Sequence, residues 1–249
     1  MILYNYHQGP RNWQFKKLKT EKTQLYYGLE IEIESPDRQR AIDLASNTFG
    51  DYLCCAERDS SLDDCAGLEL IFNPCSYNFL QSQAKNFNEY FQRLIDLGAS
   101  AHDNGRCGLH VNLSRRGLTI LDIYKFSKIF SSLSVYTRKK ITRRKKFTYC
   151  KFEPIEPRFF SKILLKKRGS AHYDAISIKN NEIAEIRFFR GTLNIESFFA
   201  SIEIINQTVD FVQQNSLVDC SQSPFLKFLN KNKELKKYFK NKNRGLECV

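Results

Sequence analysis

Residues 27–34 read YGLEIEIE, and from Leu29 onward apolar and acidic side chains alternate strictly. Successive side chains of a β-strand point to opposite faces of the sheet, so a period of two predicts a strand with two different faces. The aliphatic face would carry Leu29, Ile31 and Ile33, and the carboxylate face would carry Glu30, Glu32 and Glu34. The apolar face has to be covered by packing.

The same alternation recurs along the chain. It predicts further strands at Gly67–Phe72, Gly108–Ser114, His172–Ile178 and Glu182–Phe189. Alternation favours an antiparallel sheet, because strands of parallel sheets are continuously apolar. Apolar residues at helical spacing predict helices at residues 38–48, 79–97, 120–133 and 195–213. The expected fold class is α+β, with helices covering the apolar face of the sheet.

The polar faces of these strands carry an unusual set of side chains. For one strand, a solvated face is the simpler interpretation. Across four strands, carboxylates on neighbouring strands would repel one another unless cations lie between them. Oxygen ligands with at most one histidine suit Mg²⁺ or Mn²⁺ better than Zn²⁺. The expected metal ligands are Glu30, Glu32, Glu69, His110 and Glu185.

Positive charge is unevenly distributed in this chain of 249 residues, which has a net charge of +12. Residues 136–168 hold 13 and residues 226–244 hold eight of the 39 lysines and arginines. Each segment is either a solvated surface or a binding site for a polyanion, such as nucleotide phosphates, a nucleic acid or an acidic substrate.

Other features of the sequence limit the class of protein. No apolar run approaches the length of a membrane span, and the first residues do not resemble a secretory leader. The eight cysteines have no paired metal spacing and are interpreted as reduced thiols. We therefore expect a cytoplasmic protein without a membrane partner.

Boundaries and remaining acids can also be assigned. We expect one domain over residues 1–215, followed by a basic helical or flexible extension over 216–249. Glu57, Asp63 and Asp64 are expected at the surface, whereas Glu34 is either a further ligand or the solvated end of its strand.

Four motifs occur in a specific order: YGLEIEIE, ERDSSLDDCAGLELIFNP, CGLHVNLS and IAEIRFFRGTLN. Looser matches are YNYHQGP and ITRRKKFTYC. In this order the chain resembles the amidoligase family of the glutamine synthetase/glutamate–cysteine ligase superfamily, of the type found in phage and mobile elements. For a viral protein, the expected location is the host-cell cytoplasm.

The resemblance implies a glutamine synthetase-like sheet that holds ATP and Mg²⁺ or Mn²⁺ on its polar face. It implies an ATP-dependent carbon–nitrogen ligase that activates a carboxylate as an acyl phosphate, which an amine then attacks. Which acid and which amine are joined stays open. The roles carried over are catalytic for Glu30, Glu185, Arg187 and Arg190. Nucleotide or substrate contacts are carried over for Asp59, Ser61, Asn112, Arg144 and Arg187. In the basic segment, either Arg143 or Arg144 matches the family arginine.

The chain also departs from the family pattern. His172-Tyr173 replaces an Arg-Tyr pair, and Ser177 stands at the position of an asparagine. Arg190 reaches the metal face only if the strand ends or bends at Arg190-Gly191.

Two other functions are compatible with this sequence. A phosphotransferase or nucleotidyltransferase would need the same metals and arginines, because these groups recognise phosphates. A non-catalytic nucleic-acid-binding protein would use the basic segments 136–168 and 226–244. In the first segment, bases would stack on Tyr136, Phe147, Tyr149 and Phe152.

Overall fold

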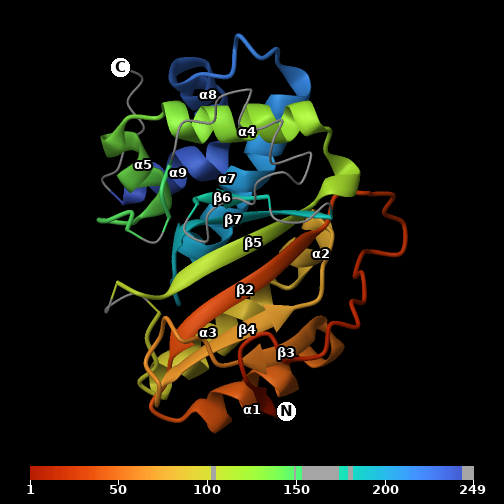
Figure 1. Cartoon of the computed structure of the whole chain (residues 1–249), viewed down its shortest axis with the longest axis vertical. Helices are drawn as coiled ribbons and strands as arrows, with labels where there is room; N and C mark the ends of the chain where they lie inside the picture. Colours follow the sequence, from red (N-terminus) through yellow and green to blue (C-terminus); the bar gives the residue numbers. More distant parts are fainter. Residues whose placement is uncertain (102–104, 149, 153–173, 179–181, 243–249) are drawn as a thin grey trace. The chain divides into compact units, whose positions relative to one another are not determined.

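The computed structural model describes residues 1–101, 105–148, 150–152, 174–178 and 182–242, and combines helices with mostly antiparallel strands (Figure 1). The chain forms two compact units. Unit 1 contains residues 1–114 and 190–195, and unit 2 contains residues 115–189 and 196–249. The predicted α+β class is confirmed.

Unit 1 is built on a sheet with the strand order β1-β3-β4-β2-β5. The strands are β1 (Leu3–Tyr4), β3 (Leu53–Glu57), β4 (Gly67–Phe72), β2 (Tyr27–Glu34) and β5 (Gly108–Ser114). β1 pairs with β3 in parallel, and the other pairings within this unit are antiparallel. The predicted bounds of β2, β4 and β5 are confirmed.

Helices cover the apolar face of this sheet, as expected. They are α1 (Arg38–Phe49), α2 (Tyr77–Ser82) and α3 (Ala84–Asp96), and a short 3-10 turn over Gly50–Tyr52 leads into β3. Phe72 of β4 lies 5.0 Å from Phe49 of α1 and 5.4 Å from Phe87 of α3, measured between ring centroids. The expected helix 79–97 is two helices, because α2 ends at Ser82 and Gln83 separates it from α3, which begins at Ala84.

Unit 2 contains most of the remaining helices and one strand pair. Its elements are a 3-10 turn (Arg115–Gly117), α4 (Ile120–Ser132), α5 (Val135–Thr142), β6 (Ile176–Ser177), β7 (Ile183–Arg190), α7 (Ile195–Gln214), α8 (Gln222–Leu229) and α9 (Lys233–Asn241). β6 and β7 are antiparallel, with Ser177 opposite Glu185. Of the expected strand 172–178, His172 and Tyr173 lie outside the described residues.

The segment that follows residue 215 belongs to unit 2. Helices α8 and α9 pack into unit 2, where Phe225 of α8 lies 5.6 Å from Phe211 of α7 between ring centroids. The Tyr238 hydroxyl of α9 donates to Ser197 Oγ at 3.1 Å. The lysines of this segment lie on the outer face of amphipathic helices, whose inner residues complete the core.

The basic segment 136–168 is described only in part. Phe147 and Phe152 lie 5.3 Å apart between ring centroids, and Phe152 lies 5.4 Å from Phe188. Lys140 Nζ sits 4.1 Å from the centroid of the Tyr136 ring. Tyr149 and residues 153–168 lie outside the described residues. In the described part of the chain, no helix combines the length and apolar character that crossing a bilayer requires.

Candidate metal centre

The strand register of unit 1 brings the predicted polar residues together. Glu32 of β2 lies opposite Glu69 of β4, and Glu30 of β2 lies opposite His110 of β5. Asn112 lies opposite Gly28, one position further along the same face. Alternation within three strands and their antiparallel pairing therefore place these side chains on one patch of the sheet.

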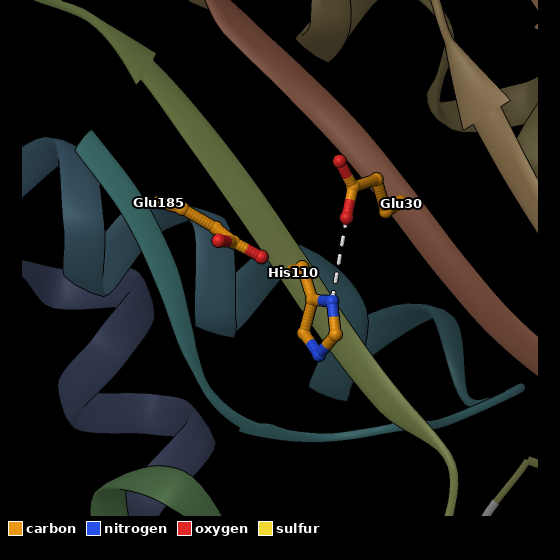
Figure 2. Close-up of side chains that lie close together, drawn as sticks. All are labelled: Glu30, His110 and Glu185. Carbon is orange, nitrogen blue, oxygen red and sulfur yellow. Dashed lines mark hydrogen bonds and ion pairs between the residues drawn. The ribbon is translucent and has the colours of Figure 1, made fainter. Parts of the chain in front are cut away.

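Glu32, Glu69 and His110 form a group whose ligand atoms all lie within 4.8 Å of one another. His110 Nε2 is 3.4 Å from Glu32 Oε1, and its Nδ1 is 4.0 Å from Glu69 Oε1. The same Nδ1 is 3.4 Å from Glu30 Oε2, and a dashed line in Figure 2 marks this contact. The relative exposure of Glu32, Glu69 and His110 is only 4%, 5% and 5%. These three side chains are buried, whereas those of an ordinary solvated face would be exposed.

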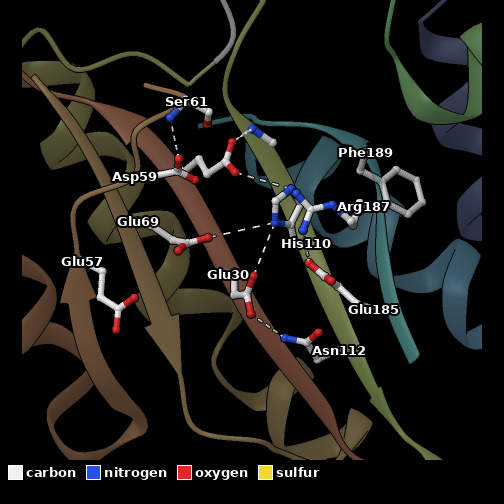
Figure 3. Close-up of polar contacts among 12 residues, drawn as sticks. Glu30, Glu57, Asp59, Ser61, Glu69, His110, Asn112, Glu185, Arg187 and Phe189 are labelled. Carbon is white, nitrogen blue, oxygen red and sulfur yellow. Dashed lines mark hydrogen bonds and ion pairs between the residues drawn. The ribbon is translucent and has the colours of Figure 1, made fainter. Parts of the chain in front are cut away.

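Neighbouring groups orient the carboxylates of the patch. Asn112 Nδ2 donates to Glu30 Oε1 at 2.7 Å, a contact drawn in Figure 3. The Gly108 backbone N–H donates to Glu32 Oε2 at 2.5 Å. The Asn112 carbonyl oxygen, Oδ1, is buried and has no hydrogen-bond donor among the described residues. A buried acceptor without a donor favours a cation or a donor from a ligand at this position.

The charges of the patch are unfavourable without such a cation. Burial raises the pKa of Glu69 well above its usual range, and the charges of Glu30, Glu32, Asp59 and Glu57 raise it further. A divalent cation removes the like-charge repulsion and replaces the lost hydration. Carboxylates, an amide oxygen and a single imidazole form a donor set that suits Mg²⁺ or Mn²⁺.

The loop before β4 contributes polar residues that hold its own backbone. Asp59 Oδ1 accepts the Ser61 backbone N–H at 2.7 Å (Figure 3). Asp63 Oδ1 accepts the backbone N–H groups of Cys65 and Ala66, both at 2.9 Å. These hydrogen bonds lower the pKa of the Asp63 carboxyl. Asp63 therefore shapes the turn, and Asp59 lies close enough to affect Glu69.

Glu34 lies at the end of β2 and has a structural environment of its own. Its carboxylate pairs with Arg106 at 3.3 Å and accepts the Asp63 backbone N–H at 3.3 Å. It is not part of the candidate metal group found among the described residues.

The expectation that Glu57 lies at the surface is wrong. Its side chain is fully buried, and its carboxylate pairs with Arg11 at 2.7 Å. The backbone N–H groups of His7 and Gly9 also donate to it, both at 2.9 Å. Residues 5–11, termed the N-terminal strap, therefore enclose this carboxylate. Glu57 lies opposite Glu69 in the sheet, so the acidic row extends one strand further than predicted.

Sequence reasoning missed Glu57 because β3 does not alternate between polar and apolar residues. The segment LCCAE contains one charged side chain, and a bulge interrupts its register with β4. The loosely matched YNYHQGP segment was the available indication, since it contains two residues that donate to Glu57.

The remaining predicted site residues belong mainly to unit 2. Glu185, also drawn in Figure 2, forms an ion pair with Arg187 on the same face of β7. Arg144 follows α5, is 8% exposed and donates to the Phe189 carbonyl oxygen at 3.1 Å. Strand β7 ends at Arg190, as the glycine that follows it suggested. Arg190 itself belongs to unit 1. The predicted metal role of Glu185 and phosphate roles of the arginines stay predictions.

No family model matches this chain, and no curated protein matches it. The resemblance to amidoligases therefore depends on the motifs and their order alone.

We expect metal binding to depend on Glu32 and to be independent of Glu34. Mg²⁺ or Mn²⁺ at about one hundred times its dissociation constant should stabilise the wild-type chain by about 2.7 kcal/mol. Glu32→Gln should remove this stabilisation because it deletes a buried anionic ligand. Glu34→Gln, two residues away on the same strand face, should retain it. Thermal unfolding with and without metal measures the effect, and equal stabilisation of both variants would contradict the assignment.

Glu69 should make the metal-free protein less stable as pH rises. Its folded-state pKa is raised, so the unfolded chain releases this proton at a lower pH than the folded chain. Stability is therefore lost as pH rises above about 4.3, the usual pKa of glutamate. Glu69→Gln should gain stability over wild type between pH 4 and 8, measured by urea unfolding with a chelator. The exposed Glu89→Gln serves as control, and a pH-independent difference for Glu69→Gln would contradict the proposed burial of charge.

Proposed function

We propose that this protein is an ATP- and Mg²⁺- or Mn²⁺-dependent carbon–nitrogen ligase that joins a carboxylate to an amine. The observation that carries the proposal is the buried group of Glu32, Glu69 and His110, with ligand atoms within 4.8 Å of one another. Burying such a group is unfavourable unless a cation is bound there. A divalent cation held by carboxylates commonly binds the phosphates of a substrate.

The residues of unit 1 have different roles in the proposed function. Glu32, Glu69 and His110 would hold the metal, and Glu30 would complete its ligands because His110 Nδ1 is 3.4 Å away. Asn112 fixes the Glu30 carboxylate and leaves its own carbonyl oxygen available. When bound, the metal neutralises charge on the phosphates of ATP and on the leaving group.

Unit 2 contributes a separate observation that favours an anion. Arg144 is buried, its Nε has no hydrogen-bond acceptor, and no carboxylate pairs with it among the described residues. Burial raises the pKa of Cys150, and the positive charges of Arg144 and Arg187 lower it. A buried guanidinium without a counter-ion is destabilising, and phosphate oxygens match its planar donors. Arg144 is therefore the candidate phosphate contact in the basic segment, whereas Arg143 donates to Ser201 Oγ.

The nature of the bond formed depends on the resemblance. Metals and arginines bind phosphates equally well in a phosphotransferase or nucleotidyltransferase, so the carboxylate and the amine come from the motif order alone. Of the aromatic residues suggested for base stacking, Phe147 and Phe152 pack against each other, and Phe152 also packs on Phe188. Their packing favours a core role, and so supports the enzymatic proposal over simple nucleic-acid binding.

ATP turnover should require Glu30. With Mg²⁺, ATP and mixtures of candidate acids and amines, wild type should release phosphate and form an amide, which mass spectrometry detects. Glu30→Gln should reduce phosphate release by roughly 100-fold or more, because electrostatic groups of this kind contribute that much to rate. Glu34→Gln should retain turnover. An unchanged rate for Glu30→Gln would exclude the site, and a phosphorylated or adenylated product would exclude the ligase assignment.

Because of Arg144, the free energy of unfolding should depend on the presence of anions. Arg144→Met removes a buried charge that has no carboxylate partner among the described residues, so we expect the variant to be more stable than wild type without added anions, by roughly 1–3 kcal/mol. Inorganic phosphate should stabilise wild type and have little effect on this variant. Lys145→Met, an exposed neighbouring change, should behave like wild type. Denaturant unfolding with and without phosphate measures both effects, and equal phosphate stabilisation of Arg144→Met and wild type would contradict the role.

A further inference from the structure

A second cluster of reactive side chains lies in unit 1, between β3 and the N-terminal strap. Strand β3 pairs Leu53 with Phe72 and Cys55 with Ile71, so Cys54 is the extra residue of a β-bulge. Two residues of a bulged strand oppose one residue of its partner. The bulge therefore places two adjacent cysteines where ordinary alternation would separate them.

Both sulfur atoms of the pair face the N-terminal strap. Cys54 Sγ lies 3.3 Å from the Pro10 carbonyl oxygen, and Cys55 Sγ lies 3.3 Å from Arg11 Nη1. Gly9 permits this close approach, because a Cβ atom there would lie 2.7 Å from Cys55 Sγ and 2.6 Å from Glu57 Oε1. The two thiols, the guanidinium of Arg11 and the carboxylate of Glu57 thus form one polar cluster.

The two thiols differ in access. Cys55 is fully buried, whereas Cys54 is partly exposed. An external electrophile therefore reaches Cys54 first, while Cys55 lies behind it as a neighbouring hydrogen-bond donor. Arg11, one-third exposed at its side chain, brings a positive charge to the mouth of the cluster.

The charges around Cys54 favour its thiolate. The hydrogen bond from Cys55 is the largest cause that lowers the pKa of Cys54 to about 7, and Arg11 lowers it further. Burial and Glu57 act in the opposite direction. By contrast, burial raises the pKa of Cys75, Cys150 and Cys220. Thiolate, rather than thiol, is the nucleophile in disulfide exchange.

We propose that Cys54 is a thiol-modification site that reacts by exchange with small disulfides of the glutathione class. The Cys54 thiolate attacks one sulfur of the small disulfide, whose S–S bond breaks as a new S–S bond to Cys54 forms. The second half of the small disulfide leaves as a thiolate, so no further oxidant is needed.

A mixed disulfide should persist at this position. Cα atoms of adjacent residues are about 3.8 Å apart across a trans peptide, below the usual range of about 4.4–6.8 Å for a disulfide. Cys55 is therefore badly placed to displace the adduct by forming a ring with Cys54. Formation of the adduct replaces the contact between Cys54 and Pro10 and so acts directly on the strap that holds Glu57.

The experiment uses the full chain, oxidised glutathione and peptide mass spectrometry that resolves each cysteine. At pH 7 about half of a thiol with a pKa near 7 is ionised, against roughly 3% of an ordinary cysteine. The lower nucleophilicity of the more acidic thiol reduces this advantage to roughly threefold. We expect Cys54 to react about three times faster than the exposed Cys65, with a half-maximal rate near pH 7.

Two variants test the origin of the reactivity. Arg11→Gln should shift the half-maximal rate of Cys54 to higher pH, and Arg11→Lys should keep it close to wild type because the charge is retained. Circular dichroism of each variant establishes that the fold is intact. The proposal is overturned if Cys65 reacts at least as fast as Cys54 at pH 7. It is also overturned if the Cys54 rate profile centres above pH 8 in the folded wild-type chain.

Discussion

Repulsion among buried carboxylates is the constraint on which the candidate site depends. Glu32 of β2 and Glu69 of β4 lie directly opposite each other on neighbouring strands. Glu30 is the next residue of β2 on the same face, so three acids share a small patch. Burial and this repulsion both raise the pKa of Glu69. The fold retains Glu32 and Glu69 in the interior, although neutral residues of similar volume often pack at lower free energy in such positions. A requirement for a bound cation explains their burial better than stability does.

The rest of unit 1 makes this arrangement rigid. Helices α1 and α3 pack on the opposite face of the sheet through aromatic side chains such as Phe49, Phe72 and Phe87. Because this face is fixed by packing, the strand register is fixed as well, and the carboxylates on the other face cannot slip by one residue. The Gly108 backbone N–H and the Asn112 side chain then set the orientation of individual carboxylates.

Much of this arrangement could be predicted from the sequence, because a period of two determines both strand and face. The bounds of β2, β4 and β5 and the grouping of Glu32, Glu69 and His110 follow from it directly. The strand β3 could not be predicted, since its bulge and its run LCCAE hide the alternation. The burial of Glu57 depends on residues about 50 positions earlier, which local patterns do not reveal. The amphipathic nature of α8 and α9 was obscured by their many lysines.

The strap has a consequence for the order in which unit 1 assembles. Its donors at His7 and Gly9 are separated from Glu57 by 50 and 48 residues, so the strap has no acceptor until β3 is in place. The strap must therefore wait for the α1 segment and β3, which follow it in the chain. Loop closure over such a distance is entropically unfavourable until the sheet offers a preformed partner. The strap is thus among the last parts of unit 1 to be fixed, and its docking marks the completion of the sheet edge.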